Sequence, residues 1–197
     1  RADAFIAAIA AVIKRLAVDR LHIIGDVFDR GPRPDHILDM LMRHHSVDIQ
    51  WGNHDMLWMG AACGSDACIF NILGISVKYS NMEMLERGYG ISLRHLTNFA
   101  QKTYADGGCF APKVISAMDR EISGTDSIAR LYKAVLVIQF KLEGQAIMRN
   151  PSFCMEDRLL LDKIDYDTRS ITIGGETSPL EDCDFPTVDR KDPYRLT

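Results

Sequence analysis

The sequence lacks the cysteine pattern of a secreted or zinc-binding module. It has five cysteines in 197 residues, an odd number, and no two of them form a CxxC pair. Extracellular disulfide frameworks use even numbers of cysteines, and structural zinc sites use closely spaced pairs. The cysteine content therefore argues against both classes and favours a protein of the reducing cytoplasm.

An excess of positive charge and long apolar runs are also missing. Lysine and arginine (23) are outnumbered by aspartate and glutamate (27), which gives a formal net charge of −4. Nucleic-acid-binding domains and anionic-membrane binders need a basic surface, so neither kind of partner is expected. No apolar run approaches membrane-spanning length, and no signal peptide opens the chain. The first residue, Arg1, precedes an expected helix directly, so we interpret the chain as a piece of a longer protein.

The stretch from residue 21 to residue 60 is predicted to form the structural unit around which the rest of the chain is arranged. An apolar run, Leu21–Ile24, predicts a strand that ends in Gly25-Asp26, and a helical pattern follows it. A second strand, Val47–Trp51, ends in a predicted polar turn, Gly52-Asn53-His54-Asp55. Parallel strands joined by a right-handed crossover bring both of their ends to the same edge of a sheet. We therefore expect Asp26 and Asn53 to meet.

The remaining segments complete an α/β fold class in three parts. Residues 1–60 form the strand–helix–strand core segment, and a helix over Ala4–Leu16 is expected to pack on one face of the sheet. Residues 61–157 are predicted to form a helical insertion, with helices over 67–79, 82–87, 93–104 and 127–149. Ser65-Asp66 can cap the first of these helices, and Asn150-Pro151 is expected to stop the last. Residues 158–197 return to the core with short strands at 163–166, 170–173 and 176–179.

The polar residues of the two turns are suited to phosphoester hydrolysis. The carboxylate of Asp26 can bridge two divalent cations, and the amide oxygen of Asn53 is a hard ligand for one of them. His54 can give a proton to a leaving alkoxide, and Asp29 can orient its imidazole. The planar guanidinium of Arg30 matches a phosphoryl group. Each residue alone has an ordinary surface role, but the combination in this strand–turn–helix context predicts a catalytic site.

Two short motifs resemble those of a known superfamily. GDVFDRGP and GNHD look like the second and third signatures of the calcineurin-like metallophosphoesterases. Longer segments resemble the class III fructose-1,6-bisphosphatases of bacteria, and this resemblance covers essentially the whole chain. These segments are HSVDIQWGNHDMLWMGAACGS, IQFKLEGQAIMRNPSF, DRLLLDKIDYD and ITIGGETSPLED.

The resemblance implies a fold, an activity and a set of site residues. The fold would be a partial metallophosphoesterase βαβ core with an inserted helical lobe and a short β-hairpin region. The activity would be removal of the 1-phosphate of fructose 1,6-bisphosphate, a step of gluconeogenesis, with a binuclear divalent metal site of the Mn²⁺ type. Asp26 would be the bridging ligand, Asn53 a ligand of the second metal and His54 the general acid. Asp29 would orient His54, and Arg30 would contact the phosphate. Asp55 is given no role beyond a supporting one.

The chain departs from the superfamily pattern in its metal ligands, which leaves other functions open. No DxH motif stands in residues 1–20, and the only histidine after His54 is His95, within a helical segment. The resemblance thus implies a partial site and a chain that is inactive by itself. One alternative is another metallophosphoesterase, acting on phosphoproteins or dinucleotides. A second is a non-catalytic interaction domain that keeps the fold. Open sheet edges and an apolar group (Phe70, Ile72, Ile75) also suggest a homo-oligomer.

Overall fold

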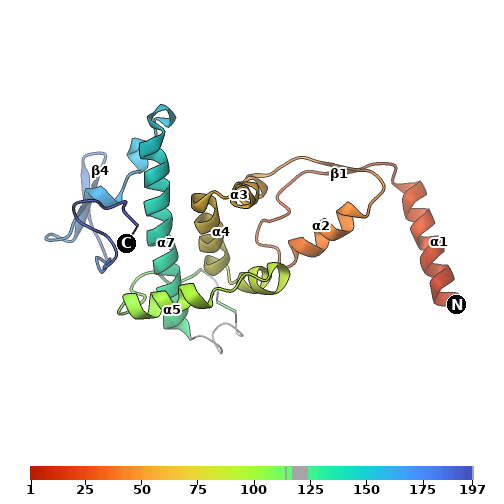
Figure 1. The fold of residues 1–197 in the computed structure, drawn as a ribbon, viewed down its shortest axis with the longest axis horizontal. Coiled ribbons are helices and arrows are strands. Elements are labelled where there is room, and N and C mark those ends of the chain that lie inside the picture. The colour runs from red at the N-terminus through yellow and green to blue at the C-terminus, as the bar shows by residue number, and fades with distance from the viewer. Residues whose placement is uncertain (114, 117–123, 197) are drawn as a thin grey trace. The chain divides into compact units, whose positions relative to one another are not determined.

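The computed structural model of the chain describes residues 1–113, 115, 116 and 124–196. The chain divides into two compact units, Arg1–Met56 and Leu57–Thr197. Figure 1 follows the elements along the chain. Helices and small sheets are both present, in agreement with the predicted α/β class. The metallophosphoesterase core and the three-part division of the chain stay predictions.

The first unit contains the expected strand–helix–strand segment. Helix α1 (Ala2–Ala17) precedes strand β1 (Leu21–Ile23), helix α2 (Pro34–Met42) and strand β2 (Val47–Ile49). The two strands pair in parallel, with Leu21 opposite Val47 and Ile23 opposite Ile49. Pro34 occupies the first turn of α2, where its missing N–H breaks no helical hydrogen bond.

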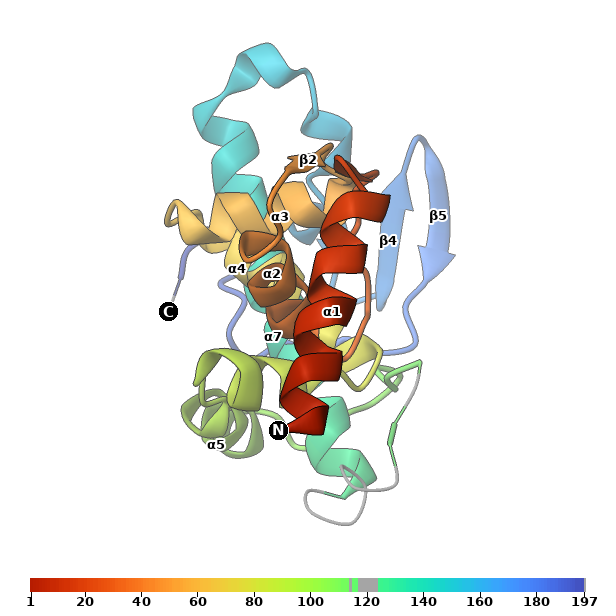
Figure 2. The ribbon, with the colours of Figure 1, turned by 90° about the vertical axis from the view of Figure 1, so that its right-hand side faces the viewer.

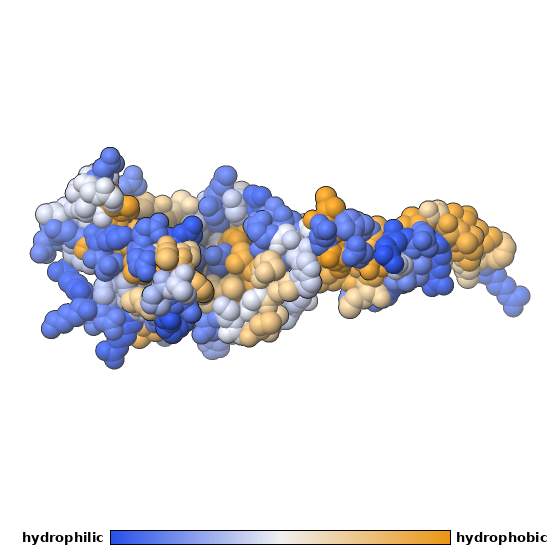
Figure 3. Space-filling model, turned by 90° about the horizontal axis from the view of Figure 1, so that it is seen from above, coloured by the Kyte–Doolittle hydropathy of each residue, from blue (hydrophilic) through white to orange (hydrophobic). Residues whose placement is uncertain are grey.

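The first unit has almost no apolar core. In residues 1–56, all of which the structure describes, the buried residues are Pro34, Leu41 and Asp55. Helix α1 buries none of its residues, and its apolar stripe is 43–81% exposed. The stripe consists of Phe5, Ile6, Ile9, Val12, Ile13 and Leu16. Figure 3 shows apolar surface over this part of the chain. The expectation that α1 packs on a sheet is wrong for the described chain, because two three-residue strands offer too small a face.

The second unit is built around one long helix. Helix α3 (Asn53–Ala62) begins just before the boundary, and α4 (Asp66–Lys78), a π-helical turn η1 (Met84–Gly88), α5 (Arg94–Thr103) and α7 (Thr125–Arg149) follow. Both α4 and α5 pack against α7 (Figure 1). Ser65 caps α4 as predicted, since its side chain accepts a hydrogen bond from the N–H of Cys68. The long helix ends at Asn150-Pro151, also as predicted.

These helices enclose a continuous apolar core. Its buried members are Ile72, Leu73, Val77, Met84, Leu85, Leu93, Ala100, Tyr104, Ile128, Leu131, Tyr132, Ala134 and Val135. The β-branched Val135 is fully buried in the middle of α7, where packing outweighs its weaker helix propensity. The apolar group suggested as an oligomer contact is not exposed: Ile72 belongs to this core, and Phe70 and Ile75 are half-buried. These three residues therefore give no support for a homo-oligomer, which stays a prediction.

The C-terminal part of the second unit forms a small antiparallel sheet. Short 3₁₀ turns, η2 (Pro151–Phe153), η3 (Glu156–Arg158) and η4 (Leu161–Lys163), lead into β3 (Ile164–Asp165). Strands β4 (Ser170–Ile173) and β5 (Glu176–Pro179) complete the order β3-β4-β5, and Figure 2 shows β4 beside β5. Both glycines of the β4–β5 turn, Gly174 and Gly175, have positive φ, which explains why the turn uses them.

Two buried lysines on α7 hold the irregular tail that follows the sheet. Lys133 Nζ lies 2.7 Å from Asp182 Oδ2, over the rings of Tyr104, Phe110 and Phe185. Lys141 Nζ donates to the carbonyl oxygens of Thr187 and Arg195. In the described part of the chain, no helix combines the length and apolar character needed to cross a membrane.

Candidate functional site

The ends of β1 and β2 come together as the sequence predicts. Gly25 has φ +96°, and a Cβ on it would lie 2.4 Å from the backbone nitrogen of Gly52. A Cβ on Gly52 would lie 2.0 Å from Oδ1 of Asp26. Real Cβ atoms do not approach other heavy atoms so closely, so both positions require glycine. The two turns are therefore packed backbone against backbone.

The second motif is a helix start and not the predicted polar turn. Asn53, His54 and Asp55 form the first turn of α3. The carboxylate of Asp55 accepts a hydrogen bond from the N–H of Gly52 at 2.9 Å, which is one half of a capping box. This bond stabilises the helix from its first residue, and for that reason the chain does not pass through a separate turn.

Asp26 lies at the N-terminus of α3. The backbone N–H of His54 donates to Asp26 Oδ1 at 3.1 Å. Unpaired N–H groups and the helix dipole make a helix N-terminus favourable for negative charge. Asp26 and Asn53 are both exposed, so the two predicted metal ligands lie at the surface where the turns meet.

His54, Asp29 and Arg30 form a hydrogen-bonded group beside this point. His54 Nε2 lies 3.2 Å from Asp29 Oδ1. Arg30 Nε and Nη2 donate to the two oxygens of Asp29 at 2.6 and 3.1 Å. These hydrogen bonds from Arg30, together with the charge of His54, lower the pKa of the Asp29 carboxyl below its usual value. Asp29 thus stays ionised and can hold the imidazole of His54 in one orientation.

The predicted metal ligands, Asp26 and Asn53, have the chemistry that a hard divalent cation needs, but two ligands are too few for a metal site. Carboxylate and amide oxygens are ligands that Mg²⁺ and Mn²⁺ accept. The described residues contain no group of three or more His, Cys, Asp or Glu side chains that could hold a metal ion. His95 lies on α5, in the second unit. A complete metal site would need ligands in addition to Asp26 and Asn53.

Sequence reasoning missed the role of Asp55, to which it gave only a supporting part. Its carboxylate is buried and accepts hydrogen bonds from both turns, from the N–H groups of Asp26, Phe28 and Gly52. One signal was available, because an acidic residue three positions after a glycine that starts a helix matches the capping-box spacing.

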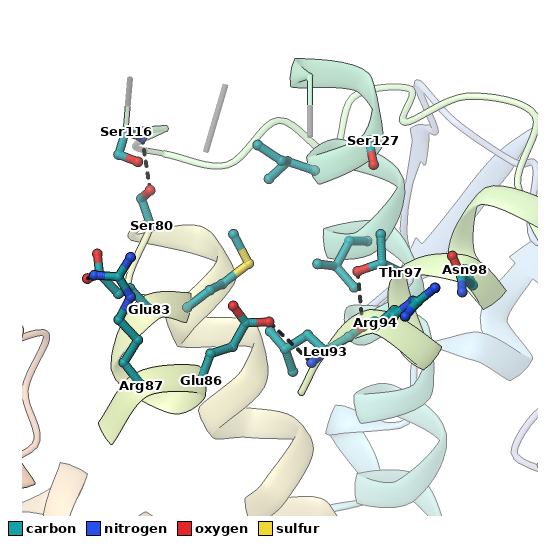
Figure 4. Close-up of a pocket in the computed structure, with 13 residues that line it drawn as sticks. Ser80, Glu83, Glu86, Arg87, Leu93, Arg94, Thr97, Asn98, Ser116 and Ser127 are labelled. Carbon is teal, nitrogen blue, oxygen red and sulfur yellow. Dashed lines mark hydrogen bonds and ion pairs between the residues drawn. The ribbon is translucent and has the colours of Figure 1, made fainter. Parts of the chain in front are cut away.

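The second unit holds a pocket of its own. It has a volume of about 430 Å³, and Figure 4 shows charged side chains around it. Arg87 pairs with Glu83 at 2.7 Å, and Glu86 accepts a hydrogen bond from the N–H of Leu93. Among the described residues that line the pocket, two glutamates, Glu83 and Glu86, balance two arginines, Arg87 and Arg94, so the lining has no excess of positive charge for a phosphate ester. None of the predicted site residues lines it.

Comparison with known proteins decides the family. The sequence profile of a family described as Firmicute fructose-1,6-bisphosphatase matches residues 1–197. The chain belongs to this Firmicute fructose-1,6-bisphosphatase family. It is 54% identical to the fructose-1,6-bisphosphatase class 3 of Clostridium novyi and 53% identical to that of Clostridioides difficile. In both comparisons all of the chain is covered but only 30% of the relative, so the chain spans about a third of a family member. No solved structure matches it.

Proposed function

We propose that the chain supplies part of the active site of a fructose-1,6-bisphosphatase. That enzyme would hydrolyse the 1-phosphate of fructose 1,6-bisphosphate with a metal-activated water, in gluconeogenesis. The observation that supports this most is the Asp29–His54 pair, with Nε2 and Oδ1 3.2 Å apart beside the exposed carboxylate of Asp26. Family membership supports fructose 1,6-bisphosphate as the phosphoester, because the relatives are named for it.

This geometry supports a role for each side chain of the group. Because Nε2 of His54 faces Asp29, Nδ1 is the nitrogen left to give a proton to the leaving sugar oxygen. Asp29 keeps the imidazole oriented, as a carboxylate does in a hydrolase triad. Arg30, which now binds Asp29, would bind the phosphate beside that carboxylate.

Asp26 and Asn53 would hold the divalent metal, for which we propose Mn²⁺, in a binuclear centre. When bound, such ions polarise phosphoryl oxygens and lower the pKa of a bound water. The ligands that the described residues do not provide would come from regions of the family that the chain does not span. A chain with two ligands should bind metal weakly, so we expect it to be inactive alone.

Phosphate release from fructose 1,6-bisphosphate with Mn²⁺ tests the proposal. The 197 residues are placed in a chimera, where they replace the matching segment of the full-length Clostridium novyi relative. We expect activity in the chimera, loss of roughly a hundredfold or more in the His54→Ala chimera, and near-normal activity in a His95→Ala control. A chimera that folds and hydrolyses another phosphoester, but not fructose 1,6-bisphosphate, would overturn the proposed substrate. Full activity of the His54→Ala chimera would overturn the assignment of His54 as the general acid.

A further inference from the structure

Asp55 is the buried acidic side chain of the first unit, and it connects segments far apart in the sequence. Its Oδ2 accepts hydrogen bonds from the N–H of Asp26 at 2.6 Å and from the N–H of Gly52 at 2.9 Å. Its Oδ1 accepts one from the N–H of Phe28 at 3.2 Å. The residue is only 8% exposed. A carboxylate with both oxygens bound by backbone N–H groups is fixed in place.

The N–H that Asp26 donates to Asp55 belongs to a residue in an unfavourable backbone conformation. Asp26 has φ 52°, in the left-handed region that non-glycine residues rarely adopt. The hydrogen bond from this N–H to Asp55 therefore offsets a local cost and holds the residue in that conformation. In return, the side chain of Asp26 accepts the N–H of His54 at 3.1 Å. Each turn thus offers a carboxylate to the backbone of the other.

We propose that Asp55 is a positioning residue for the catalytic group. It sets the orientation of the Asp26 carboxylate and the place of His54 without touching substrate or metal. The inference deepens the proposed function and rests on it for the catalytic consequence. The structural part, that Asp55 fixes the Asp26 and Phe28 backbone, stands on the hydrogen bonds alone.

The Asp55→Asn variant tests the structural part in the 197-residue chain. Asparagine keeps the shape but replaces one acceptor oxygen with a donor, which cannot accept from an N–H. We expect the amide ¹H–¹⁵N resonances of Asp26, Phe28 and Gly52 to move by more than those of any α7 residue. The matched control is Asp39→Asn, an exposed aspartate of α2. Circular dichroism of the helical unit shows whether the variant chain stays folded. Asp55→Glu, which keeps a carboxylate at this position, is a second control for general unfolding. Amide resonances that stay in place in Asp55→Asn would overturn the proposal.

The catalytic part is tested in the chimera with the same variants. Loss of a group that orients metal ligands typically weakens metal binding about ten- to a hundredfold. We expect Asp55→Asn to raise the Mn²⁺ concentration for half-maximal activity and to lower kcat more than it changes KM. Unchanged Mn²⁺ dependence and kcat would overturn the positioning role. If the unmutated chimera hydrolyses no fructose 1,6-bisphosphate, the proposed function fails separately, and the amide shifts still decide whether Asp55 positions the turns.

Discussion

Different forces stabilise each of the two units of the chain. In residues 57–196, helices α4, α5 and α7 bury a continuous apolar core. In residues 1–56, apolar side chains stay exposed, and the turns are joined by hydrogen bonds to the carboxylates of Asp26 and Asp55. Apolar burial stabilises a fold without fixing individual polar atoms, whereas directed hydrogen bonds fix them to within fractions of an ångström. A polar site can therefore be organised by local hydrogen bonds, with little apolar core of its own.

The largest expected loss of stability comes from Lys133→Met in the second unit. Lys133 is fully buried, and the change leaves the nearly buried carboxylate of Asp182 without its cation. Removal of one partner of a buried pair costs about 3–5 kcal/mol of unfolding free energy. Urea unfolding measures this loss, and Lys102→Met, on the exposed face of α5, is the control. Equal stabilities for the two variants would show that the Lys133–Asp182 pair contributes nothing to the stability of this unit.

Truncation of one leucine in each unit compares the units directly. Leu131 is 3% exposed in the helical core, and Leu131→Ala should cost about 2–5 kcal/mol of unfolding free energy. Leu16 is 81% exposed on α1, and Leu16→Ala should change stability by less than about 0.5 kcal/mol. Thermal unfolding followed by circular dichroism measures both. A similar cost at Leu16 would mean that α1 buries its stripe in solution, and the contrast between the units would then disappear.

Gly52→Ala should disturb the turns and leave the helical unit intact. The new Cβ would lie 2.0 Å from Asp26 Oδ1, so the carboxylate must move. We expect Mn²⁺ binding by the chimera to weaken on the order of tenfold, as for other changes that misplace metal ligands. Gly31→Ala is the matched control, because nothing lies within 4 Å of a Cβ at that position. Titration with Mn²⁺ and the helical circular dichroism signal separate a local effect from a global one.

The smallest expected effect is a pH dependence within the first unit. Hydrogen bonds from the Arg33 guanidinium lower the pKa of Asp35 from 3.8 to about 2. A lowered carboxyl pKa stabilises the folded state above the unfolded value of 3.8, and that contribution is lost as the pH falls toward about 2. The ¹³C shift of the Asp35 carboxyl should titrate near the lower value, and near 3.8 in Arg33→Gln. An unchanged midpoint in Arg33→Gln would exclude this ion pair in solution.

Local patterns predicted the elements well, and they predicted burial poorly. The strand ends at Gly25 and Gly52, the helix cap at Ser65 and the end of α7 at Asn150 follow from short-range rules, and all are confirmed. The helical period of α1 indicates an apolar stripe but not what covers it. Similarly, no local pattern predicts that Lys133 and Lys141 are buried, since their partners come from some 50 residues away.

The site was partly predictable for the same reason. Spacing and strand order placed Asp26 beside the GNHD motif, and the structure brings Asp29 to His54. The helical start at Asn53 was missed, because glycine, asparagine and aspartate are also typical of turns. The three hydrogen bonds of Asp55 depend on backbone conformation on both sides of the site, which no residue pattern states.

Amide hydrogen exchange measured by NMR on the 197-residue chain tests most directly whether hydrogen bonds to carboxylates join the two turns. The N–H groups of Asp26, Phe28, Gly52 and His54 should exchange more slowly than those of α1, which has no buried residue. They should lose this protection in Asp55→Asn, while α7 keeps its own. Exchange at these amides as fast as in α1, or unaffected by Asp55→Asn, would contradict the carboxylate-bound arrangement of the turns.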